Sequence, residues 1–175
     1  MSGRHVEPHR ERAKGRGVLP ALCSVIGTVI ILGVIVLLLP MSAPRLLGYR
    51  VYNVVSGSMV PAIPQGSMVL VRPLDWSEIA EGDVIAFESN GSVVTHRVTK
   101  IHVVEGEFIT KGDANEDADI TPVPFDRLIG RVERHIPLLG EITAHASSVL
   151  GKIYLFGTLM CGVLFHVLAN RLREV

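Results

Sequence analysis

The chain has 175 residues, of which 17 are basic and 17 acidic, so its formal net charge is zero. This length allows one domain, and the balanced charge gives no electrostatic reason to bind nucleic acid. Hydrophobic residues make up 48% of the chain and gather in two long segments, a pattern typical of a membrane protein with a modest soluble part. The two cysteines, Cys23 and Cys161, lie inside those segments, so no disulfide framework and no Cys-x-x-Cys metal site is expected between them.

The first apolar segment predicts an uncleaved transmembrane anchor over residues 18–40. A helix over residues 18–39, none of them charged, rises about 33 Å, which is enough for a hydrocarbon core of about 30 Å. The run is longer than the apolar region of a cleaved signal peptide. The basic stretch over residues 1–17 favours a cytoplasmic tail, so the chain emerges on the outer face of the membrane.

Residues 41–145 predict a mostly β extracytoplasmic domain flanked by the two membrane helices. Strand patterns occupy residues 68–72 and 128–132, and residues 83–87 and 92–98 flank Asn90-Gly91, a strong hairpin signal. A second hairpin pattern joins residues 101–104 to residues 107–110. The sequon Asn90-Gly91-Ser92 is better explained by the turn than by glycosylation.

The second apolar segment predicts a further membrane helix over residues 146–169. Lys152 interrupts it near its start, where the ammonium group can reach the outer interface. Arg171 and Arg173 follow it and favour a cytoplasmic tail over residues 170–175. A buried amphipathic C-terminal helix is the alternative, and His166 is expected to be a packing or interfacial residue.

Ser58, eighteen residues past Pro40, is the candidate nucleophile, provided that a base lies close to it. His96 follows the Asn-Gly turn and shares its strand face with Val94 and Val98, so it is expected to point toward the core. A histidine in that position is most often a buried, hydrogen-bonded structural residue. The same desolvated setting also suits a general base near neutral pH.

Residues 110–119 form an acidic segment that predicts either a surface loop or part of a catalytic site. The spacing of Asp and Asn resembles a calcium loop, but it lacks the glycine at the sixth position and the flanking helix pair of an EF-hand. As a catalytic element, this segment would supply the carboxylate that orients His96 and stabilises its imidazolium form.

Three ordered motifs of the chain resemble those of the type I signal peptidases. They are Ser56-Gly57-Ser58-Met59-x-Pro61, Thr95-His96-Arg97-Val98 and Lys111-Gly112-Asp113-Ala114-Asn115. The resemblance covers roughly residues 45–140 and the anchor before them. It is to the branch found in archaea, in the endoplasmic reticulum and in some Gram-positive bacteria, because His96 stands where the common bacterial branch has a lysine.

The resemblance implies a role for each matching residue. Ser58 corresponds to the nucleophile and His96 to the general base. Asp113 matches one essential carboxylate, and Asp119 matches the third member of a Ser-His-Asp triad, so we rank Asp119 slightly ahead while leaving both open. The Ser58 backbone N–H and the Ser56 side chain are candidates for the oxyanion hole.

The implied function is a membrane-bound serine endopeptidase that removes signal peptides from secreted precursors, without metal or cofactor. Its expected partners are signal-peptide-bearing precursors and the lipid bilayer, and no nucleic acid. It is expected in the cell membrane as a two-span protein with its catalytic domain outside. Two alternatives are a specialised peptidase that matures a few surface or fibre proteins and a catalytically inactive membrane scaffold. A self-cleaving repressor-type peptidase is disfavoured by the two spans.

Overall fold

The computed structural model describes residues 17–174, which fall into two compact units. The smaller unit holds residues 17–35 together with residues 154–174, and the larger unit holds residues 36–153. Apart from Gly17, the predicted basic tail lies outside the described residues.

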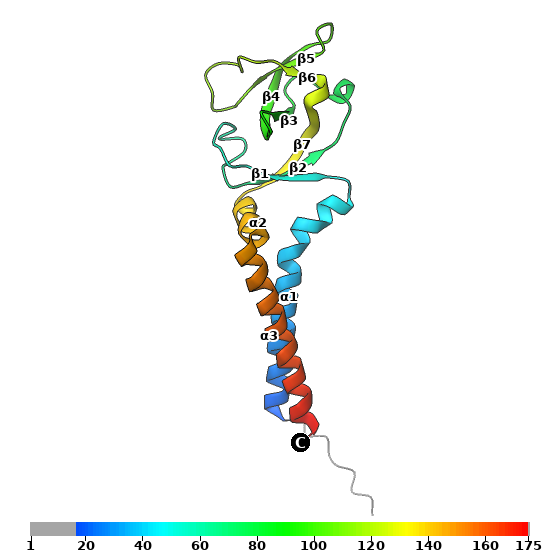
Figure 1. Cartoon of the computed structure of the whole chain (residues 1–175), viewed down its shortest axis with the longest axis vertical. Coiled ribbons are helices and arrows are strands. Elements are labelled where there is room, and N and C mark those ends of the chain that lie inside the picture. Colours follow the sequence, from blue (N-terminus) through cyan, green and yellow to red (C-terminus); the bar gives the residue numbers. More distant parts are fainter. Residues whose placement is uncertain (1–16, 175) are drawn as a thin grey trace, which may run out of the picture. The chain divides into compact units, whose positions relative to one another are not determined.

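The larger unit is built on a seven-stranded sheet in which all neighbouring strands are antiparallel (Figure 1). The strands are β1 (Arg50–Asn53), β2 (Met68–Arg72), β3 (Val84–Ser89), β4 (Ser92–His102), β5 (Glu107–Lys111), β6 (Val123–Pro124) and β7 (Leu128–Ile136). Their order across the sheet is β1-β2-β7-β3-β4-β5-β6, so β7 returns from the end of the domain to lie between β2 and β3. Two short 3₁₀ helices, η1 (Trp76–Glu78) and η2 (Phe125–Arg127), lie in the connections.

Both predicted hairpins are present. Asn90 and Gly91 join β3 to β4 with φ angles of 49° and 75°, the left-handed conformation that a two-residue hairpin turn requires. The second hairpin joins β4 to β5, with Gly106 at φ 73°. The strand predicted over residues 101–104 is not a separate element, because residues 101–102 end β4 and residues 103–106 form the turn. The predicted strand over residues 68–72 is confirmed as β2, and the one over residues 128–132 is the first part of the longer β7.

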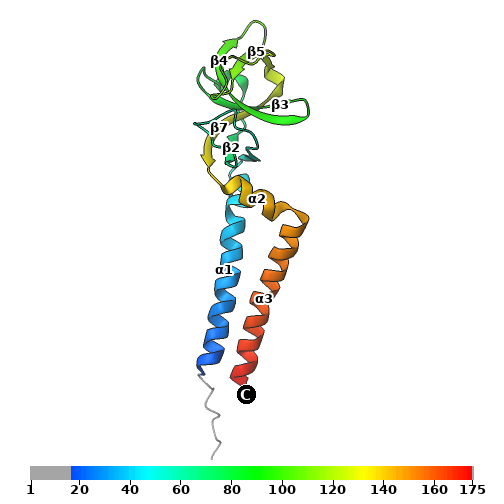
Figure 2. The ribbon, with the colours of Figure 1, turned by 90° about the vertical axis from the view of Figure 1, so that its left-hand side faces the viewer.

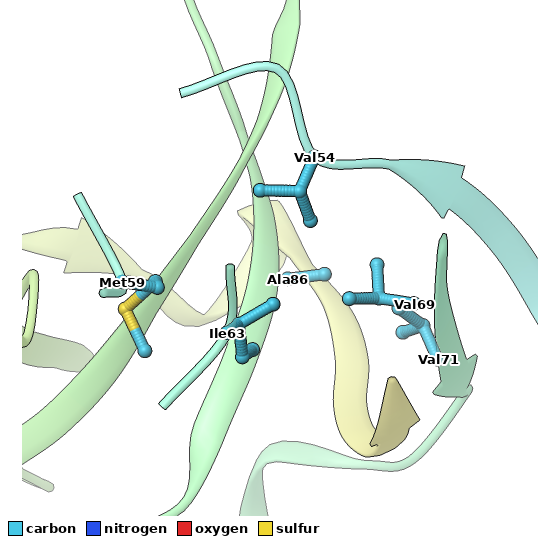
Figure 3. Packing of buried hydrophobic residues seen from close by; sticks show 6 residues of the cluster. All are labelled: Val54, Met59, Ile63, Val69, Val71 and Ala86. Atoms are coloured by element: carbon cyan, nitrogen blue, oxygen red, sulfur yellow. The ribbon is translucent and has the colours of Figure 1, made fainter. Parts of the chain in front are cut away.

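Two clusters of buried side chains lie on opposite faces of β3. Neighbouring residues of a strand point to opposite faces, and Ala86 belongs to one cluster while Ile85 and Phe87 belong to the other. The first cluster, called core 1 below, is shown in Figure 3 and contains Val54, Met59, Ile63, Val69, Val71 and Ala86. The second cluster, core 2, contains Ile79, Ile85, Phe87, Val98, Phe108 and Val123.

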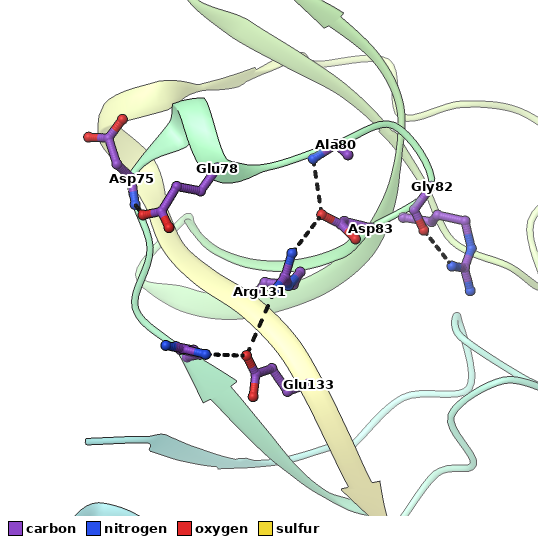
Figure 4. Close-up of polar contacts among 9 residues, drawn as sticks. Asp75, Glu78, Ala80, Gly82, Asp83, Arg131 and Glu133 are labelled. Carbon is purple, nitrogen blue, oxygen red and sulfur yellow. Dashed lines mark hydrogen bonds and ion pairs between the residues drawn. The ribbon is translucent and has the colours of Figure 1, made fainter. Parts of the chain in front are cut away.

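A network of charged side chains crosses the β2, β3 and β7 region (Figure 4). Arg131 on β7 lies 3.4 Å from the Asp83 carboxylate and 3.8 Å from the Glu133 carboxylate. Glu133 also accepts hydrogen bonds from Arg72, at 3.2 Å, and from the Tyr49 hydroxyl, at 2.8 Å. The hydrogen bond from Tyr49 is the main cause of a pKa of Glu133 below its ordinary value.

The described residues 17–174 also form three α-helices: α1 (Val18–Leu46), α2 (Leu139–Ser147) and α3 (Val149–Glu174). Both α1 and α3 are long and apolar enough to cross a membrane. Most of the apolar side chains of α3 are exposed, so the alternative of a buried C-terminal helix is wrong. The mostly β domain flanked by two long apolar helices confirms the predicted fold class.

In the smaller unit, α1 and α3 run antiparallel and approach closely at two glycines (Figure 2). A Cβ atom added to Gly27 lies 2.8 Å from the Gly162 carbonyl oxygen, and one added to Gly162 lies 2.9 Å from Ile31 Cγ1, so a side chain at either position requires a shift of its neighbours. Thr28 Oγ1 and His166 Nε2 lie 3.3 Å apart beside this contact. His166 therefore packs between the two helices, as the sequence predicts.

Candidate active site

Ser58 lies in the irregular loop between β1 and β2, and this loop is anchored by its own apolar residues. Val54, Met59 and Ile63 all enter core 1, and the Met59 side chain is fully buried. The loop is also closed by backbone bonds, since Val54 N–H donates to Ser67 O and Gly66 N–H donates to Val54 O. Ser58 is thus fixed by the methionine that follows it, while its own side chain stays partly exposed.

The serine motif brings two hydroxyl groups together. Ser56 Oγ and Ser58 Oγ lie 3.3 Å apart, within hydrogen-bond distance. Gln65 Nε2 donates to the Val55 carbonyl oxygen at 2.9 Å, which holds the backbone just before the motif. The Ser58 N–H finds no protein acceptor among the described residues 17–174.

His96 projects from β4 on the core 2 face of the sheet. It pairs with Ile85 across β3 and β4, and Val98, two residues on, is part of core 2. Its side chain is 11% exposed, and the Phe87 ring meets the imidazole edge to face at 6.3 Å between centroids. The alternation predicted from the sequence therefore places this residue correctly.

Asp119 is the carboxylate beside the histidine. Its Oδ2 lies 2.6 Å from His96 Nδ1 and also accepts a hydrogen bond of 2.6 Å from the Thr110 hydroxyl. The Asp119 N–H donates to the Thr110 carbonyl oxygen at 2.8 Å, so the acidic loop returns to the β5 strand at this residue.

Asp113 has a different partner, the guanidinium group of Arg97. Arg97 Nε and Nη2 donate to the two carboxylate oxygens at 2.8 and 2.6 Å, the paired geometry that Arg and a carboxylate form best. These hydrogen bonds raise the pKa of Arg97 above its ordinary value. Arg97 Nη1 donates in addition to the Gly82 carbonyl oxygen at 2.7 Å.

The segment after β5 also contacts the serine loop. Ala114 N–H donates to the Ser58 carbonyl oxygen at 2.9 Å. Gly112 is buried against the same oxygen, and a Cβ atom added there lies 2.7 Å from it. The residues from Thr110 to Asp119 therefore touch Ser58 through the backbone and His96 through a side chain.

The structure does not join Ser58 to His96 directly. No hydrogen bond links these two side chains within the described residues, where the Ser58 hydroxyl contacts Ser56 and the His96 ring contacts Asp119. An open cavity of about 610 Å³ lies over His96, and it is lined by Phe87, Ser89, Val94, His96 and residues 115–121.

Two residues of this region were given no role from the sequence: Thr110, and Gly112 of the Lys-Gly-Asp motif. Thr110 has a detectable signal, because it alternates with Phe108 along a predicted strand and so is expected to be buried. Gly112 carries no such signal, since only the fold shows which oxygen lies against it. Within residues 17–174, no group of three His, Cys, Asp or Glu side chains is placed to hold a metal ion.

Comparison with known proteins finds similarity to signal peptidases, although no family model matches the chain. Signal peptidase I W of Bacillus subtilis is 42% identical over 85 residues, which cover 46% of this chain and 44% of that protein. The signal peptidase complex catalytic subunit SEC11C of Homo sapiens is 29% identical over 102 residues, which cover 51% of this chain and 53% of that protein. The chain thus spans about half the length of the curated relatives it matches, and these similarities support the type I signal peptidase family for it.

Proposed function

We propose that this chain is a membrane-bound serine endopeptidase that removes signal peptides from secreted precursors. The observation that carries the proposal is the His96–Asp119 hydrogen bond of 2.6 Å in a domain that also holds the Ser-Gly-Ser-Met loop. The similarity to two proteins named as signal peptidases supports the substrate class. The pairing of His96 with a carboxylate favours the branch of the type I signal peptidases in which a histidine replaces the lysine base.

His96 is the proposed general base, and Asp119 is the carboxylate that orients it. Because Nδ1 faces Asp119, the ring presents its other nitrogen, Nε2, to the substrate side. The carboxylate then stabilises the imidazolium ion that forms when Nε2 takes the Ser58 proton. Asp113 serves the site indirectly in this scheme, through its ion pair with Arg97.

The reaction proceeds through an acyl-enzyme. Ser58 Oγ attacks the scissile carbonyl, His96 passes the proton to the leaving amine, and a water molecule activated by the same histidine releases the acyl group. The Ser58 N–H and the Ser56 hydroxyl stabilise the negative oxygen of each tetrahedral intermediate. These two donors are assigned from their positions, because the N–H has no acceptor among residues 17–174 and the hydroxyl lies 3.3 Å from Ser58 Oγ.

Substrate binding is expected to bring Ser58 and His96 into hydrogen-bond contact. Catalytic hydrogen bonds are often long in free enzymes and shorten in the substrate complex. In this scheme the precursor lies extended along an exposed strand edge, with small residues in shallow apolar pockets beside Ser58. The contact between the two serines is then exchanged for a contact between Ser58 and His96.

The two apolar helices support a place in the membrane. We propose that α1 and α3 both cross it, with the strands on the outer side and both chain ends in the cytoplasm. Ser58 then lies close to the outer surface, where the cleavage site of a membrane-held signal peptide emerges.

Purified full-length protein in detergent, incubated with a precursor that carries a small-residue cleavage site, tests the proposal. The wild type and Ser92→Ala, a change at an exposed serine of the β3–β4 hairpin, are expected to cleave the precursor. Ser58→Ala is expected to lose about 10³-fold or more of the rate while keeping its circular dichroism spectrum. Equal cleavage rates for Ser58→Ala and the wild type show that Ser58 is not the nucleophile.

Two further outcomes separate the alternatives. No cleavage by the wild type, together with no labelling of Ser58 by an acylating inhibitor, favours an inactive scaffold. Cleavage of a few surface-protein precursors only, seen by comparing protein N-termini in cells with and without the chain, favours a specialised peptidase.

A further inference from the structure

Thr110 lies behind the proposed catalytic pair, and no step of the mechanism above uses it. Its side chain is fully buried on β5. It pairs with Val98 across β4 and β5, and Val98 stands two residues along β4 from His96, so Thr110 and His96 share one face of the sheet.

Thr110 makes two hydrogen bonds to a single residue, Asp119. Its hydroxyl donates to Asp119 Oδ2 at 2.6 Å, and its carbonyl oxygen accepts from the Asp119 N–H at 2.8 Å. One bond fixes the backbone of Asp119 against the β5 strand, and the other fixes the carboxylate. The oxygen that receives the hydroxyl is the same one that lies 2.6 Å from His96 Nδ1.

We propose that Thr110 is a positioning residue of the peptidase reaction, which sets the orientation of the Asp119 carboxylate and through it the orientation of the His96 ring. This inference rests on the function proposed above. The branched Thr side chain has few χ1 rotamers open to it, so the hydroxyl is held in place by the strand that carries it. An aspartate carboxylate turns easily about its last side-chain bond, and a second donor on Oδ2 limits that rotation.

A neighbouring threonine shows what an ordinary hydroxyl does on the same pair of strands. Thr99 on β4 donates to the Ile109 carbonyl oxygen at 3.0 Å, as side-chain hydroxyls commonly do, and its side chain is exposed. Thr110 instead donates to a carboxylate, and charge-assisted hydrogen bonds of this kind are roughly twice as strong as neutral ones.

The first test compares Thr110→Ser with Thr110→Cys in the full-length protein in detergent. Both variants lose the γ-methyl group, so they differ in whether position 110 carries a hydroxyl or a weakly donating thiol. Thr110→Ser is expected to retain most of the wild-type kcat, and Thr110→Cys to lose about ten-fold or more in kcat with an unchanged KM. Thr99→Val, which removes the neighbouring hydroxyl, is expected to keep the wild-type kcat.

The second test observes the hydrogen bond itself and requires no substrate. The proton between His96 Nδ1 and Asp119 is expected to give a far-downfield proton NMR resonance, which His96→Ala removes. The resonance is expected to keep its position in Thr110→Ser and to move or broaden in Thr110→Cys. A change confined to thermal stability, with the resonance unmoved, gives Thr110 a merely structural role.

Equal kcat values for Thr110→Ser and Thr110→Cys overturn the proposal, and so does an unshifted resonance in Thr110→Cys. These results leave the proposed function standing as long as Ser58→Ala is inactive. The proposed function fails on a different result, full cleavage by Ser58→Ala, and the resonance measurement still decides whether Thr110 orients the pair.

Discussion

Two aspartates six residues apart in one loop have different partners. Asp119 contacts the His96 ring and the Thr110 hydroxyl, whereas Asp113 forms a paired hydrogen bond with Arg97. Under the proposed mechanism only Asp119 acts on the base, His96. Asp113 holds the loop that contacts the Ser58 carbonyl oxygen.

The two aspartates are therefore expected to respond differently to the same substitution. Asp119→Asn is expected to lower kcat by about 10³–10⁴-fold with little loss of stability, because an amide neither orients the imidazole correctly nor stabilises its charged form. Asp113→Asn is expected to lower the free energy of unfolding by about 1.5–3 kcal/mol, because it removes a charge-assisted pair. Cleavage kinetics and thermal unfolding measure the two effects, and the reverse pattern contradicts the assignment.

The sequence predicts the orientation of His96 but not its partner. Alternation along a strand is a local property, so Val94, His96 and Val98 indicate the buried face without knowledge of the fold. The choice between Asp113 and Asp119 depends on the path of a loop, and that path is set by contacts with β4 and β5. Thr110 shows the same limit, because its burial is predictable whereas its acceptor is not.

At the scale of elements, the segment after β5 is packed against the Ser58 loop. Ala114 N–H bonds to the Ser58 carbonyl oxygen, and Gly112 leaves the space that this oxygen occupies. The glycine of the Lys-Gly-Asp motif is thus explained by a contact with another motif rather than by its own backbone angles.

Gly112→Ala is expected to disturb Ser58 more than it disturbs the sheet. The added methyl group lies 2.7 Å from a backbone oxygen, which cannot move without shifting the serine loop. We expect a loss of kcat of about 100-fold, in line with the effect of small misplacements of reacting groups. Single-turnover cleavage and circular dichroism check this, and a fully active variant shows that the loop absorbs the methyl group.

The hydrogen bond from Tyr49 to Glu133 ties the segment before β1 to β7. It lowers the pKa of Glu133 and raises the pKa of Tyr49. Both shifts therefore stabilise the hydrogen-bonded pair at pH values between the two pKa values, where Glu133 is ionised and Tyr49 is neutral. The depressed carboxylate contributes stability above the ordinary pKa of 4.5, and that contribution is lost as the pH falls through the lower folded-state value.

Tyr49→Phe is accordingly expected to lower the thermal midpoint at neutral pH and to match the wild type more closely as the pH falls below 4.5 and through the lower folded-state pKa of Glu133. The control is Tyr52→Phe, whose ring packs against core 1 and whose hydroxyl has no protein hydrogen bond among residues 17–174. Thermal unfolding of all three proteins across pH measures the effect. A midpoint difference that does not depend on pH shows that Glu133 is not its source.

The sequence predicts the longer elements of the sheet and misses its edges. The hairpins are recognised because Asn-Gly and Glu-Gly turns separate alternating segments. The edge strands β1 and β6 have four and two residues, too few to show a period, and both depend on pairing with a neighbour. Helix α2 (Leu139–Ser147) is also missed, because most of it lies before the predicted membrane helix over residues 146–169, and the break at Ser148 lies inside that predicted helix.

At the scale of the whole molecule, the order of elements places all seven strands between two helices that can cross a membrane. If both helices cross, the two ends of the chain lie on one side and the sheet lies on the other. Arg171 and Arg173 after the last apolar residues favour the cytoplasm for the ends.

Cysteine labelling tests this topology in sealed right-side-out vesicles. In a background without Cys23 and Cys161, Thr99→Cys, at an exposed position of β4, is expected to react with an impermeant maleimide at once. Asn170→Cys, near the end of α3, is expected to react only after the vesicles are permeabilised. The opposite order contradicts the proposed orientation, and immediate labelling of both positions contradicts the span by α3.

The burial of Met59 has a consequence for oxidative chemistry. An oxidant reaches a thioether only where the sulfur is accessible, and the Met59 side chain has no exposed surface. Conversion of Met59 to the sulfoxide then requires that the loop between β1 and β2 leave core 1, so the rate of oxidation reports how often this loop opens. A polar sulfoxide is disfavoured in an apolar cluster, so oxidation of Met59 is expected to displace the neighbouring Ser58 until a reductase restores the thioether.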